Sequence, residues 1–128
     1  MCLLSGYVWL GVAGAIAMAT GASTPGPVYD ALLHAVFLGF VVAMIFGHAP
    51  IVFPAILGKA LPFRSTFYVH LAILHVSVAL RLSGDLVESL ARARAWGGLL
   101  NAVALLIFVM NSAWSIGASS AITRVESR

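Results

Sequence analysis

The sequence predicts an all-α protein that is integral to a membrane, and two observations carry this prediction. Of the 128 residues, 62% are apolar and 9% are charged, whereas a soluble domain is typically about 45–50% apolar and about 25% charged. Four apolar segments also approach the roughly 20 residues that a helix needs to cross about 30 Å of hydrocarbon. Too few charges remain to cover a water-facing surface, which excludes soluble enzymes and disordered tails.

The basic net charge of +3 fits the same class of protein. The arginines stand in separate clusters between apolar runs, which is typical of residues that anchor helix ends at a membrane surface. A phosphate-binding stripe would need a continuous basic face. The expected partners are therefore the lipid bilayer and other membrane subunits, or further copies of this chain, and not nucleic acid.

The predicted architecture is a single transmembrane domain over residues 1–128, folded as a four-helix bundle. Alternation of apolar and polar residues with period two is missing, which disfavours a membrane β-barrel. The predicted helices cover residues of about 3–20, 31–57, 66–82 and 96–122.

Turn residues separate these segments. The first segment begins without Lys or Arg, so we interpret it as a retained helix and not as a signal peptide. Its residues Gly11, Gly14 and Ala17 would permit close approach of another helix. Ser65 is a candidate N-cap for the third helix, and the segment from Asp85 to Arg94 is expected to form a short interfacial helix.

Two prolines interrupt the second helix. Pro50 and Pro54 each remove a backbone donor, which kinks or ends a helix. We favour a kink that aims His48 into the bundle. The alternative is that the helix already spans the membrane by Ala49 and that the chain from Pro50 onward returns along the interface.

The four histidines are the outstanding polar residues at membrane depth. His34 and His48 lie on the second helix, 14 residues apart, so they fall within about 40° of one face and about 21 Å apart along the axis. Two-haem b-type cytochromes use this spacing. The antiparallel third helix brings His70 to the level of His48, so this pair is the candidate ligand pair for haem b. His34 faces the level of Arg81 to Gly84 and has no histidine partner.

Copper or zinc is the competing interpretation, because imidazole suits iron, copper and zinc alike. His48, His70 and His75, with Met44 nearby, would make such a metal site. The structural alternative is that the histidines bind serines, carbonyls or water inside the bundle. Arg81 either extends to the interface beside Asp85, or pairs with another anion.

The anions that could pair with Arg81 are the carboxylate of Asp30 and a haem propionate. The candidate cofactor ligands are therefore the four histidines and Arg81. No catalytic constellation of side chains is visible, so any redox activity would belong to a cofactor or a partner.

Around these histidines the chain resembles the NnrS-like family of bacterial membrane proteins. The resemblance rests on residues 33–40 and 44–50 and continues through Leu74-His75 and Arg81 to residues 96–98, about 70 residues in all. The family is described as containing haem and copper and is associated with nitric-oxide metabolism. The resemblance implies that His34, His48 and His75 are ligands.

The predicted function is that of a haem- or copper-binding protein of the bacterial inner membrane, acting in redox chemistry or sensing with other subunits. The alternative is a small accessory subunit of a larger respiratory or photosynthetic complex, without a cofactor of its own. The side that holds both termini also holds Lys59, Arg64, Arg124 and Arg128. The opposite side holds Arg92 and Arg94, with Arg81 near a helix end. The positive-inside rule therefore favours cytoplasmic termini.

Overall fold

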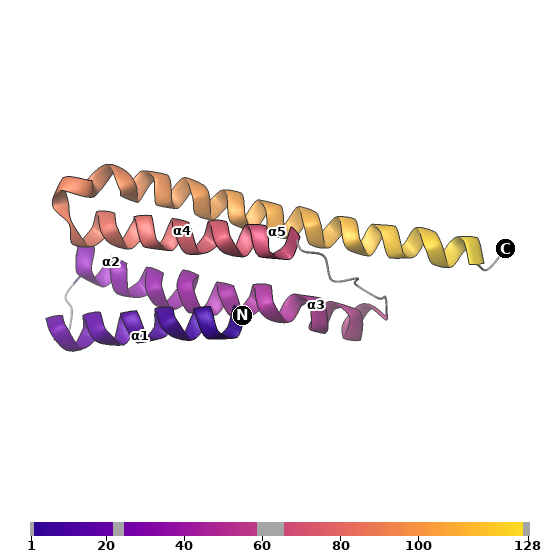
Figure 1. The fold of residues 1–128 in the computed structure, drawn as a ribbon, viewed down its shortest axis with the longest axis horizontal. Helices are drawn as coiled ribbons and strands as arrows, with labels where there is room; N and C mark the ends of the chain where they lie inside the picture. The colour runs from indigo at the N-terminus through magenta and orange to yellow at the C-terminus, as the bar shows by residue number, and fades with distance from the viewer. Residues whose placement is uncertain (1, 22–24, 59–65, 127–128) are drawn as a thin grey trace.

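The computed structural model describes residues 2–21, 25–58 and 66–126, and all the regular structure in these ranges is helical. Four long helical segments follow one another (Figure 1). The second of them is continuous but changes its helical type twice. The elements are α1 (Cys2–Thr20), α2 (Pro27–His34), the π-helix η1 (Ala35–Val42), α3 (Ala43–Leu57), α4 (Thr66–Leu86), the 3₁₀ turn η2 (Glu88–Leu90) and α5 (Ala91–Glu126).

Within the described residues, four helices are long and apolar enough to cross a membrane, as predicted. They are Leu3–Thr20, Pro27–Ile56, Tyr68–Leu86 and Glu88–Trp114. The predicted N-cap Ser65 and the basic residues Lys59, Arg64 and Arg128 lie outside the described residues.

The predicted interfacial helix from Asp85 to Arg94 is wrong. α4 continues to Leu86, Val87 takes an extended conformation with φ −122°, and α5 begins at Ala91 after one 3₁₀ turn. Asp85 lies near the end of α4 and Arg94 lies near the start of α5. The two form an ion pair, with Nε of Arg94 2.6 Å from Oδ1 of Asp85. Asp85 therefore belongs to α4 and Arg94 to α5, whereas the sequence predicts a separate short helix that contains both residues.

α3 remains helical through Pro50 and Pro54 and ends at Leu57. There Gly58 adopts the left-handed conformation with φ 62°, which is a common way to end a helix. The predicted orientation of His48 into the bundle is wrong, because His48 is exposed and Phe46 is buried instead.

The helices lie in a row in the order α1, α2 to α3, α4 and α5 (Figure 1). α1 packs against the segment α2 to α3, that segment packs against α4, and α4 packs along α5. α4 is thus an inner helix, whereas α1 and α5 lie at the two edges.

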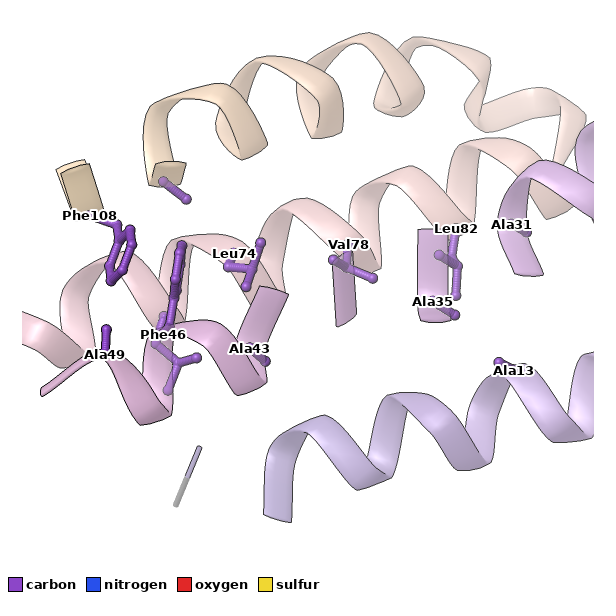
Figure 2. Packing of buried hydrophobic residues seen from close by; sticks show 12 residues of the cluster. Ala13, Ala31, Ala35, Ala43, Phe46, Ala49, Leu74, Val78, Leu82 and Phe108 are labelled. Carbon is purple, nitrogen blue, oxygen red and sulfur yellow. The ribbon is translucent and has the colours of Figure 1, made fainter. Parts of the chain in front are cut away.

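In the second helical segment, from α2 to α3, alanines line the face that packs into the core (Figure 2). Small residues let helix backbones approach closely, which is how helices associate in a membrane. Two aromatic rings, Phe46 of α3 and Phe108 of α5, stack with centroids 4.4 Å apart. The buried apolar residues are Ala13, Ala31, Ala35, Ala43, Phe46, Ala49, Leu71, Leu74, Val78, Leu82, Ala104 and Phe108.

Glycines allow the closest approach between α4 and α5. A Cβ atom on Gly97 would lie 2.8 Å from the carbonyl oxygen of Ser77, and one on Gly84 would lie 2.6 Å from the backbone nitrogen of Arg94. The sequence predicts close helix approach at Gly11, Gly14 and Ala17 of α1 instead. Ala17 is half-buried. Gly11 and Gly14 face open space, with nothing within 4 Å of an added Cβ.

Candidate functional site

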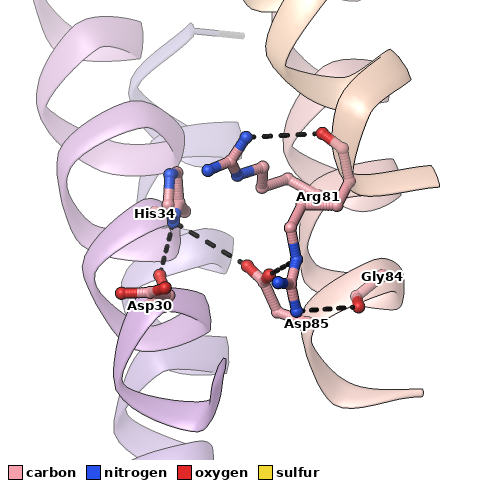
Figure 3. A network of polar contacts seen from close by, with 6 residues as sticks. Asp30, His34, Arg81, Gly84 and Asp85 are labelled. Atoms are coloured by element: carbon pink, nitrogen blue, oxygen red, sulfur yellow. Dashed lines mark hydrogen bonds and ion pairs between the residues drawn. The ribbon is translucent and has the colours of Figure 1, made fainter. Parts of the chain in front are cut away.

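A cluster of ionisable side chains lies where α2, α4 and α5 meet (Figure 3). Asp85 is its centre, and its side chain is fully buried. Nε of Arg94 lies 2.6 Å from one carboxylate oxygen, and Nδ1 of His34 lies 3.9 Å from the other. A second nitrogen of Arg94 donates to the carbonyl oxygen of Gly84 at 3.3 Å. Burying a carboxylate is expensive unless it is paired, and here α5 supplies the cation.

Arg81 contributes to this cluster differently from the prediction. Its Nη1 donates to the carbonyl oxygen of Arg94 at 3.3 Å, and its Nε is buried without a hydrogen-bond partner among the described residues. The carboxylate of Asp85 is engaged by Arg94 instead, and the backbone carbonyl of Asp30 bonds to Nδ1 of His34. The ion pairs among the described residues are those of Asp85 with Arg94 and with His34, so the alternative pairing of Arg81 with Asp30 does not form.

The predicted depth of His34 along the helices is confirmed. His34 is expected opposite residues 81–84 of the third spanning helix, and it lies beside Asp85, the next residue of that helix. The antiparallel register of the second and third spanning helices was thus correct. The sequence does not predict the ion pair of Arg94 with Asp85, because both residues were assigned to one interfacial helix.

His75 has a partner that the sequence analysis missed. Nε1 of Trp9, on α1, lies 2.9 Å from Nδ1 of His75 on α4, and the two rings are stacked with centroids 6.3 Å apart. Gly39, on the helix between them, leaves room for the indole, since a Cβ there would lie 2.5 Å from Cγ of Trp9. The pattern gave Trp9 only a packing or interface role.

The candidate ligand pair His48 and His70 is not brought together. His70 is buried, with its ring 4.7 Å from that of Phe46 and 5.4 Å from that of Phe108. His48 is two residues beyond Phe46, which is about 200° around a helix, and it is exposed. The helix face that meets His70 therefore presents Phe46 and not His48.

The remaining member of the predicted copper or zinc site, Met44, packs on α1. Its terminal methyl occupies the space beside Gly6, where an added Cβ would lie 2.7 Å away. Among the described residues, no group of three or more His, Cys, Asp or Glu side chains is placed to hold a metal ion. The residues proposed for a site within one chain thus do not fit together as a metal centre.

The hydrogen-bond partners also assign the tautomers of three histidines. The indole nitrogen of Trp9 is only a donor, so Nδ1 of His75 accepts and Nε2 of the neutral ring carries the proton. For His34 and His48 the partner of Nδ1 is a backbone carbonyl, which only accepts. Nδ1 therefore carries a proton in these two rings, and in the neutral form of each ring Nε2 has the lone pair that a metal requires.

Apolar grooves mark the surface of the described residues. One of about 480 Å³ lies between α4 and α5, one of about 380 Å³ lies between α1 and α4, and one of about 210 Å³ lies beside His48 on α3. The second groove includes His75 in its lining.

Residues 1–117 match the model of a family described as a domain of unknown function (DUF8744). This match overturns the resemblance to the NnrS-like family, and the ligand roles that the resemblance implied lose that support. Apart from the histidines, the residues that carried the resemblance are common in membrane helices. No curated protein and no solved structure matches the chain.

Proposed function

We propose that this chain, which belongs to the DUF8744 family, is a multi-pass membrane protein that serves as a small accessory subunit of a larger membrane assembly. The observation that carries the proposal is the open row of helices. In a closed bundle every helix has neighbours on two sides, whereas α1 and α5 stand at the edges of this row (Figure 1).

The burial of the spanning segments supports this interpretation. In the segment Tyr68–Leu86 44% of the residues are buried inside the chain, compared with 11% for Leu3–Thr20 and 17% for Glu88–Trp114. The edge helices therefore offer long apolar flanks for helices of another subunit. The internal histidines His34 and His75 already have partners within the chain, so the fold gives them a structural role.

We propose that the protein lies in the bacterial inner membrane, and that its termini are cytoplasmic, as the charge distribution of the sequence favours. Photo-crosslinking in native membranes tests the subunit proposal. A benzophenone amino acid at Leu106, which is 64% exposed on α5, should crosslink to a partner polypeptide. The same group at Val76, which is 54% exposed on the inner helix α4, is the matched control and should give a much weaker product.

Mass analysis of the product distinguishes another subunit from a second copy of the chain. If Leu106 gives only lipid adducts, the chain acts alone and the accessory role is refuted.

A second candidate function, the binding of haem b or copper, is favoured by His48. Its Nδ1 lies 2.7 Å from the carbonyl oxygen of Met44, which fixes the ring and leaves the lone pair on Nε2. Metal-binding histidines are commonly oriented by such a bond to the other nitrogen. His48 is exposed beside Ile45 and Val52, so the remaining ligand would come from another polypeptide.

A reduced-minus-oxidised absorption spectrum with metal analysis on the gently solubilised complex tests this candidate. A haem α-band or stoichiometric copper that is lost in His48→Gln and kept in His34→Gln would support it. A flat spectrum without iron or copper would remove the candidate and leave the accessory role untouched.

A further inference from the structure

We draw no further inference here: the strongest candidate, the apolar groove between α1 and α4 that His75 helps to line, carries none, because Nε2 of His75 is buried and nothing in the structure shows what covers the groove.

Discussion

Trp9 and His75 are joined by a hydrogen bond of 2.9 Å between residues 66 positions apart in the chain. This bond links the first spanning helix to the third across the helix that lies between them. It depends on Gly39, since a side chain there would collide with the indole. Gly39 thus helps to set the position of α1 on the rest of the protein.

Replacement of Gly39 by Ala should destabilise the fold by about 1–3 kcal/mol, the usual cost of forcing an extra group into a packed interface. The added Cβ would lie 2.6 Å from Cβ of Trp9, so the indole must move away from His75. Unfolding of the protein in mixed micelles by titration with SDS measures the change. Gly14→Ala is the matched control, because nothing lies within 4 Å of that position, and an equal loss there would contradict the assignment.

Replacement of Trp9 by Phe should cost about 0.5–1.5 kcal/mol through the lost hydrogen bond, and it removes the constraint on the tautomer of His75. In the native protein the ¹⁵N spectrum of His75 should show a proton on Nε2. In Trp9→Phe the population with the proton on Nδ1 should increase. A native spectrum with the proton on Nδ1 would refute the hydrogen bond as described.

The four long apolar helices could be predicted from the sequence because each depends only on the length and apolar content of its own segment. About 20 apolar residues suffice to predict a helix that can cross a membrane, and the part of the chain that the structure describes has four helices of this length and composition. Antiparallel connection then fixes which residues share a level, so His34 was correctly expected near the end of α4, beside Asp85.

The side-chain partners depend on how each helix is rotated about its axis, which length and apolar content do not determine. His48 and His70 share a level, yet Phe46 occupies the face of α3 that meets His70. Likewise Gly11 and Gly14 have the composition of a contact face but point to open space. The glycines at helix contacts include Gly6, Gly39, Gly84 and Gly97. A single sequence contains no signal that separates these glycines from Gly11 and Gly14.

Replacement of Asp85 by Asn should destabilise the protein by about 1–3 kcal/mol. Breaking a fully buried ion pair costs about 3–5 kcal/mol, but the side chain of Arg94 is 40% exposed, so it regains part of its hydration. Glu88→Gln removes an exposed acid of η2 and should change stability by less than about 0.5 kcal/mol. Titration with SDS compares the two variants, and equal effects would show that Asp85 acts only through net charge.

If the four apolar helices cross the membrane one after another, η2 and the start of α1 lie on opposite sides of it. With cytoplasmic termini, a cysteine at Ser89 in η2, which is exposed, should react with a membrane-impermeant maleimide added to intact cells. The background for that variant is Cys2→Ser, because Cys2 is the single cysteine of the sequence. The unmodified protein, which keeps Cys2, should react only after the cells are opened. Labelling of both from the same side would contradict four crossings, and a reversed pattern would keep the crossings but overturn the cytoplasmic termini.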